Sequence, residues 1–161
     1  MTGPAAVEVT VHVAASPRDV FAYFTDPARY VQWMGSQASL DPVAGGAYRV
    51  QMSDGFRAAG PFLQVDPPHR VAFTWGFADE EAARHVLHEP AGASGASAMP
   101  AGSTRVTVTL DAEDEGTRVT LRHDDLPSDE LRKGHDVAWQ AYLQRLAIRA
   151  AGGDPGPDPH A

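Results

Sequence analysis

The sequence predicts an α+β fold in which a curved antiparallel sheet packs one apolar face against a long C-terminal helix. Several segments alternate apolar and polar residues with period two, which is typical of half-buried strands. Most connections between them are short, as suits antiparallel neighbours. Residues 127–150 instead space apolar side chains by three and four, which predicts an amphipathic helix. We expect a single domain over residues 1–150 and a disordered Gly- and Pro-rich tail at 151–161.

The C-terminal helix has recognisable start and stop signals. Ser128 can cap its first turn, where Asp129 carries the negative charge that the helix dipole favours. Arg149 carries positive charge near the other end, and Gly152 stops the helix. The apolar stripe consists of Leu131, Ala138, Trp139, Tyr142, Leu143, Leu146, Ala147 and Ala150.

The N-terminal part predicts one strand and two short helices. Residues 7–13 alternate strictly between valine and polar residues, as in a half-buried strand. Ser16 and Pro17 are suited to the N-cap and first position of a helix. Residues 25–27 close that helix and open a second, which we expect to run through Trp33.

The middle of the chain predicts a series of strands. Residues 38–65 contain strand segments divided by turn signals, with a hairpin turn expected at 53–55, where Asp-Gly suits a positive φ. Residues 57–65 form one of these strands, and residues 70–75 alternate as another.

The pattern breaks at residues 78–103, which are small and polar and predict a long loop. After this loop, residues 105–110 and 117–123 alternate as two strands around a hairpin turn at 113–116.

Composition excludes several classes of function. The net charge of −8 argues against a nucleic-acid-binding protein, which needs a basic face. The absence of cysteine excludes disulfides and thiol nucleophiles. We find no apolar run of about 20 residues, as a membrane span needs, and no secretory signal. The cytoplasm is therefore the default location.

Six segments occur in the order found in one known superfamily. They are VFAYFTDPARYVQWMG (20–35), LDPVAGGAYRV (40–50), DGFRAAGPFLQVDPPHRVAFTWGF (54–77), GSTRVTVTL (102–110), EGTRVTLRHDDLP (115–127) and HDVAWQAYLQRLA (135–147). Over roughly residues 5–148 the chain resembles the SRPBCC, or START-like, superfamily. Within it, the chain is most similar to the group related to the C-terminal domain of the heat-shock-protein-90 ATPase activator.

The resemblance implies a helix-grip fold: a seven-stranded antiparallel sheet around the C-terminal helix, with a cavity between them. It does not fix an activity. The sequence departs from the group at Ala138, where glycine is frequent, and in the length of the 78–103 loop. These departures leave the size and the entrance of the cavity open.

A cavity between sheet and helix suits a small hydrophobic or aromatic ligand. The residues that we expect to line it are Trp33, Met52, Phe56, Phe62, Phe73, Trp75, His123, His135, Trp139 and Tyr142. The alternative for each aromatic residue is a purely structural place in the core. Trp75, Trp139 and Tyr142 are the strongest candidates, because each combines an apolar ring with a polar group.

His123, His135 and Tyr142 are the candidate catalytic groups, although a histidine simply hydrogen-bonded at the sheet rim is the favoured alternative. His85 and His88 have a spacing that can bind metal on a helix, but no third ligand is evident. We therefore expect neither a metal nor a cofactor.

Three functions remain open: binding of a small hydrophobic molecule, cyclase or aromatase chemistry on a polyketide-like substrate, and co-regulation of a chaperone ATPase. The chaperone partner is disfavoured, because the chain lacks the separate N-terminal domain of the eukaryotic activator. A homodimer formed through an exposed strand edge stays an alternative that no particular residue supports.

Overall fold

The computed structural model describes residues 5–51, 57–76 and 102–156, and it confirms the predicted α+β architecture. The strands are β1 Ala5–Val13, β2 Gln37–Leu40, β3 Ala47–Gln51, β4 Arg57–Asp66, β5 Arg70–Trp75, β6 Thr104–Glu113 and β7 Gly116–Leu126. The helices are α1 Pro17–Thr25, α2 Pro27–Tyr30 and α5 Asp129–Ala150. The predicted hairpin turn at 53–55 and most of the 78–103 loop lie outside the described residues.

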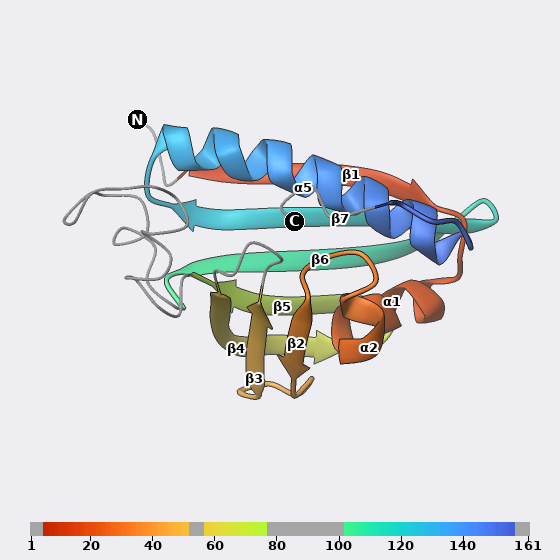
Figure 1. Cartoon of the computed structure of the whole chain (residues 1–161), viewed down its shortest axis with the longest axis horizontal. Coiled ribbons are helices and arrows are strands. Elements are labelled where there is room, and N and C mark those ends of the chain that lie inside the picture. The colour runs from red at the N-terminus through yellow and green to blue at the C-terminus, as the bar shows by residue number, and fades with distance from the viewer. Residues whose placement is uncertain (1–4, 52–56, 77–101, 157–161) are drawn as a thin grey trace.

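The strands form one seven-stranded sheet in the order β1-β7-β6-β5-β4-β3-β2, and all neighbours are antiparallel. Strand β4 turns the corner of this sheet. Its residues 57–61 pair with β3 and its residues 62–66 pair with β5. The register shifts between Phe62 and Gln64, which is an irregularity of the kind that bends a strand. Figure 1 shows the result: β2 and β3 run across the direction of β5, β6, β7 and β1.

The short helices begin where the sequence predicts, but the second is shorter than expected. Ser16 Oγ accepts a hydrogen bond from the amide of Asp19, and Asp26 caps α2 in the same manner. The prediction that α2 runs through Trp33 is wrong, because α2 ends at Tyr30. The amide of Trp33 bonds to the Tyr30 carbonyl three residues back, so the chain tightens into turns before β2.

Helix α5 lies along β1 and β7 on the inner face of the sheet (Figure 1). The predicted cap is confirmed, since Ser128 Oγ accepts from the Leu131 amide at 3.1 Å. The buried side chains of α5 are Trp139, Tyr142, Leu143 and Leu146, which belong to the predicted stripe. None of the helices in the described ranges has the length and hydropathy needed to cross a membrane.

Strands β6 and β7 are longer than the sequence predicted. They extend to a tight turn in which Glu113 pairs with Gly116 and Glu115 adopts a φ of 55°. Beyond α5, the chain folds back: Arg145 Nη1 donates to the carbonyls of Pro155 (3.3 Å) and Gly156 (3.0 Å). This contact ties the first residues of the C-terminal tail to the helix.

Two glycines give opposite expectations for alanine substitution. A Cβ on Gly60, in the bend of β4, would collide with the side chain of Thr74 on β5, whereas Gly134 in α5 has open space around it. We expect Gly60→Ala to lower the free energy of unfolding by about 1–3 kcal/mol through overpacking. Gly134→Ala should raise it by about 0.5–1 kcal/mol, because alanine loses less backbone conformational entropy than glycine when the helix forms. Urea unfolding of both variants checks this pair, and a Gly60→Ala protein as stable as the parent would contradict the collision.

Candidate functional site

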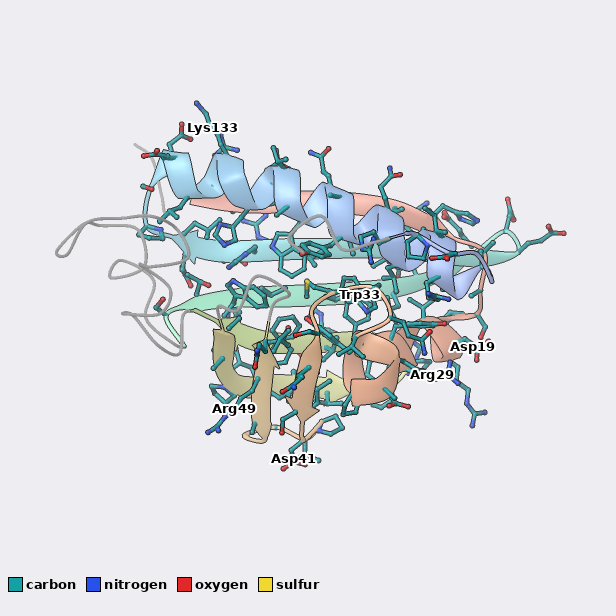
Figure 2. All side chains as sticks on the ribbon, viewed as in Figure 1. Asp19, Arg29, Trp33, Asp41, Arg49 and Lys133 are labelled. Atoms are coloured by element: carbon teal, nitrogen blue, oxygen red, sulfur yellow. The ribbon has the colours of Figure 1, made fainter. Side chains whose placement is uncertain are left out.

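A continuous series of aromatic rings runs along the inner face of the bent sheet and reaches α5 (Figure 2). We call this series the aromatic cluster; its members are Phe24, Tyr30, Trp33, Tyr48, Phe62, Phe73, Trp75, His123, His135 and Trp139. Seven of the ten predicted site residues belong to it. The cluster is therefore the candidate site.

Tyr48 stands at the centre of the cluster. Its ring stacks on Phe73 with centroids 4.1 Å apart, meets Phe62 edge-on at 5.5 Å, and lies 6.2 Å from Trp75. Sequence reasoning did not select Tyr48 as a site residue. The signal was present, because Tyr48 shares the inward face of β3 with buried Val50.

Trp33 lies near one end of the cluster and packs between helices α1 and α5. Its side chain is fully buried, and its Nε1–H donates to the Tyr23 carbonyl at 3.0 Å. Its own carbonyl accepts from Arg145 Nε of α5 at 2.9 Å. Trp33 thus connects α1 and α5 through satisfied hydrogen bonds, which agrees with a structural place in the core.

The two tyrosines of the cluster share a buried hydrogen bond. The hydroxyls of Tyr30 on α2 and Tyr48 on β3 are directly bonded to each other. Burial raises the pKa of both phenols above the ordinary value, so both stay neutral at physiological pH. The pair fastens the short helices to the sheet and holds Tyr48 in place.

At the other end, a relay of hydrogen bonds links α5 to three strands. Trp139 Nε1–H donates to His123 Nδ1 at 3.0 Å. The other ring nitrogen of His123, Nε2, lies 2.7 Å from Thr104 Oγ1, and Thr104 Oγ1 donates to the Trp75 carbonyl at 2.6 Å. Because the Thr104 proton is committed to the carbonyl, His123 Nε2 must carry the proton of the bond to Thr104.

The relay fixes His123 as a neutral imidazole. Trp139 can donate to Nδ1 only while this nitrogen is unprotonated. The side chain of His123 is fully buried. Burial, and to a smaller extent the nearby His135, together lower the pKa of His123 to about 3. Thr104 is the member of the relay that sequence reasoning missed, although strand alternation places it on the same face as buried Val106 and Val108.

His135 lies beside the relay with a different environment. Its ring meets that of His123 edge-on, with centroids 5.1 Å apart. Its Nδ1–H donates to the Leu131 carbonyl at 2.8 Å, so Nε2 is the acceptor nitrogen of the neutral ring. Burial lowers the pKa of His135, and the bond to Leu131 opposes part of this shift.

The remaining predicted residues are placed as follows. Tyr142 is buried on α5, three residues after Trp139. Met52, Phe56, His85 and His88 lie outside the described residues. Within the part of the chain that the structure describes, no group of three His, Asp or Glu side chains could hold a metal ion.

Two hollows lined by described residues lie away from the aromatic cluster. One of about 700 Å³ is on the outer face of the sheet, and one of about 290 Å³ lies between β1 and α5. We therefore base the assignment of the candidate site on the aromatic rings and their polar groups, and not on either hollow.

The chain matches one protein family and is similar to several solved structures. The model of the family "Activator of Hsp90 ATPase homolog 1-like protein" matches residues 14–151. The solution structure of an AHSA1-like protein from Rhizobium etli is 38% identical, with a TM-score of 0.70, over 99% of this chain and 89% of that chain. A comparison with curated proteins found no match.

Two other solved structures share the fold. DynU16, a protein of the dynemicin biosynthetic locus, is 25% identical with a TM-score of 0.73; the match covers 93% of this chain, which spans only 48% of that protein. The Aha1 dimer from Colwellia psychrerythraea is 16% identical with a TM-score of 0.70, over 92% of this chain and 98% of that chain. At 16% identity the latter likeness shows the fold alone.

Buried His123 and half-buried His135 predict a pH dependence of stability. The pKa of His123 is about 3 in the folded protein and 6.5 for an unperturbed histidine, so between these values the unfolded chain binds a proton that the folded chain lacks. The free energy of unfolding should be greatest above pH 6.5 and fall as the pH drops towards 3. The slope should approach about 1.4 kcal/mol per pH unit for His123, with His135 adding to it in the same direction.

Urea unfolding between about pH 5 and about pH 7 measures this slope. Most carboxylates have pKa values below this range, so they contribute little to it. His123→Gln should flatten the dependence, whereas the exposed His69→Gln should preserve it. An unchanged slope in His123→Gln would refute the assignment to this residue.

Proposed function

This chain belongs to the Activator of Hsp90 ATPase homolog 1-like family, and on that premise we propose that it binds one small hydrophobic or aromatic molecule between its sheet and α5. The aromatic cluster would supply the contact surface. Trp75 and Trp139, whose ring centroids are 5.5 Å apart, are the central contacts that we propose. Tyr142, Met52 and Phe56 complete the proposed lining.

The observation that carries this proposal is the indole N–H of Trp75. The side chain is 4% exposed, and its Nε1 has no hydrogen-bond partner among the described residues. A buried donor without an acceptor costs about 1–3 kcal/mol, and such groups in folded proteins call for an explanation. A ligand that presents a carbonyl or ether oxygen would satisfy this donor, which favours an oxygen-bearing aromatic molecule over a pure hydrocarbon.

The neighbouring groups fit such a ligand. The ring of Trp75 lies 6.2 Å from that of Tyr48 and 6.5 Å from that of His123, so two further rings flank the indole that carries this N–H. Aromatic rings favour stacked and edge-on contacts with one another. The likeness to a protein of the dynemicin biosynthetic locus, over about half of that protein, supports a biosynthetic product, such as a polyketide-like molecule, as the ligand class.

The same geometry favours binding over acid–base catalysis by His123. Both ring nitrogens of His123 already hold hydrogen bonds, and a pKa of about 3 makes it a weak base. His135 Nε2 is the imidazole nitrogen better suited to meet a ligand. We assign it the role of a hydrogen-bond acceptor that orients the ligand.

Native mass spectrometry of the protein purified from its own host tests the proposal directly. The expected result is a stoichiometric small molecule that dissociates on denaturation. Absence of any bound molecule, together with no quenching of tryptophan fluorescence by acetylnaphthalene, would overturn the proposal.

Two matched tryptophan variants separate the proposed binding role from packing. Trp75→Phe removes an N–H that has no described partner, whereas Trp33→Phe removes one that is bonded to Tyr23. We expect Trp33→Phe to lose about 1 kcal/mol more of unfolding free energy than Trp75→Phe, because only Trp33 gives up a hydrogen bond.

For ligand affinity we expect the opposite order, with a larger loss in Trp75→Phe than in Trp33→Phe. Trp75→Phe should weaken the affinity for acetylnaphthalene by about tenfold, the range expected for one buried hydrogen bond. It should change little for ethylnaphthalene, which has the same shape but no carbonyl. Fluorescence titration with both molecules measures this. Equal losses for the ketone and the hydrocarbon would contradict a hydrogen-bonding role for Trp75.

A further inference from the structure

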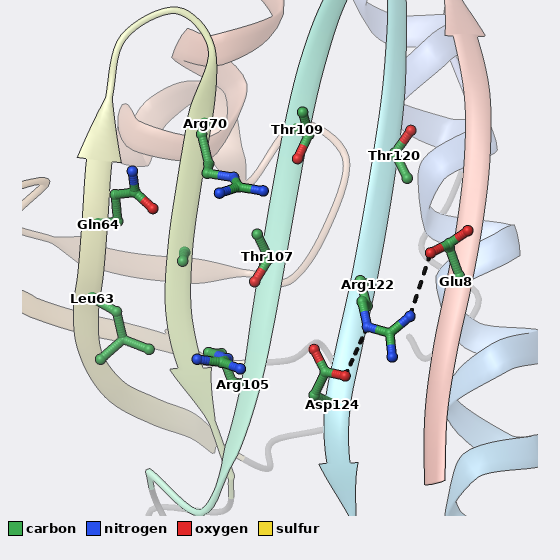
Figure 3. A pocket seen from close by; sticks show the side chains of 11 residues that line it. Glu8, Leu63, Gln64, Arg70, Arg105, Thr107, Thr109, Thr120, Arg122 and Asp124 are labelled. Carbon is green, nitrogen blue, oxygen red and sulfur yellow. Dashed lines mark hydrogen bonds and ion pairs between the residues drawn. The ribbon is translucent and has the colours of Figure 1, made fainter. Parts of the chain in front are cut away.

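The outer face of the sheet, opposite the aromatic cluster, carries a hollow of about 700 Å³ (Figure 3). Its floor on β5 and β6 is made of short side chains, Ala72 and Thr107. Three arginines from three successive strands stand around this floor: Arg70 on β5, Arg105 on β6 and Arg122 on β7. Short residues at the centre and long cations at the margin leave open space lined by guanidinium groups.

The three arginines differ in their charge partners. Arg122 is held by Asp124 at 2.8 Å and by Glu8 at 3.5 Å. Strand pairing places Asp124 opposite Arg105, but this carboxylate bonds to Arg122 instead. Within the described ranges, Arg70 and Arg105 have no ion pair, and among the residues drawn in Figure 3 only Arg122 is joined to carboxylates by dashed lines.

Strand register sets the distance between the two unpaired arginines. Arg70 pairs with Thr109, which lies four residues from Arg105 on β6. At about 3.4 Å per residue, this separates the two arginine backbones by about 14 Å. Thr107 lies midway, and arginine side chains are long enough to lean towards it from both sides. Figure 3 shows the Arg70 side chain extending from β5 towards β6.

We propose that this outer hollow is a binding site for a small organic or inorganic polyanion, whose carboxylate or phosphate groups engage Arg70 and Arg105 across Thr107. Guanidinium forks match the oxygens of both groups. The threonine hydroxyl can donate a further hydrogen bond. The site is independent of the proposed ligand between sheet and helix, because it lies on the other face.

The net negative charge of the chain means that anion binding at this hollow would depend on its own arginines. A net charge of −8 repels anions at long range, so general electrostatic attraction would not bring them here. Two uncompensated cations that converge on one hollow are a local feature against that background. A multivalent anion that reaches both should therefore bind better than a monovalent one.

Amide NMR titration with two probes tests the site and its ligand chemistry. Tripolyphosphate represents phosphates and suberate represents dicarboxylates, with acetate as the monovalent control. We expect one or both probes to shift the amides of Thr107 and Thr109, and acetate to bind at least tenfold more weakly, a typical order for the loss of one charged hydrogen-bonded contact. The probe that binds identifies the source of the anionic group.

Charge-removing variants complete the test. Arg70→Gln and Arg105→Gln should each weaken probe binding by about tenfold. Arg49→Gln is the matched control, because Arg49 is also an exposed arginine on a strand but does not line the hollow. Failure of both probes to bind, or an equal loss in Arg49→Gln, would overturn the proposal. Loss of binding only in Arg70→Gln and Arg105→Gln would establish it.

Discussion

The hydrogen-bonded relay from Trp139 through His123 and Thr104 to the Trp75 carbonyl is the constraint on which the rest of the structure depends. It joins α5 to β7, β6 and β5 through polar contacts inside an apolar interior. Apolar packing alone would allow the helix to slide or rotate, whereas a directional chain of donors and acceptors fixes one arrangement. The relay holds the backbone of Trp75 through its carbonyl, and the Trp75 indole lies against the ring of Trp139, which begins the relay.

The elements of the fold were largely predictable because their signals are local. Ser16 and Ser128 cap helices by bonding to amides three residues on, and strand alternation needs only neighbouring residues. The errors arose where tertiary packing decides. Helix α2 ends at Tyr30, where the tyrosine hydroxyl bonds to Tyr48 of a distant strand, and no local pattern encodes that contact.

The residues of the candidate site could be predicted from the sequence, but their hydrogen-bond partners could not. Aromatic residues at inward strand positions, such as Phe73 and Trp75, could be assigned to the interior from alternation alone. Which histidine nitrogen carries a proton, and which tryptophan N–H is satisfied, depends on partners far along the chain. His123 bonds to Thr104, 19 residues earlier, and Trp33 bonds to Tyr23, so the sequence alone does not distinguish their roles.

The alternation of β5, β6 and β7 has a consequence for the fidelity of folding. Each strand directs rings or aliphatic side chains to one face and arginines to the other, as Trp75 and Arg70 do on β5. A pairing error of one residue would turn a whole strand over, burying guanidinium groups and exposing aromatic surface to water. A shifted register would be destabilised on both faces of the sheet at once. The apolar inner face and the charged outer face therefore favour the same strand register during folding.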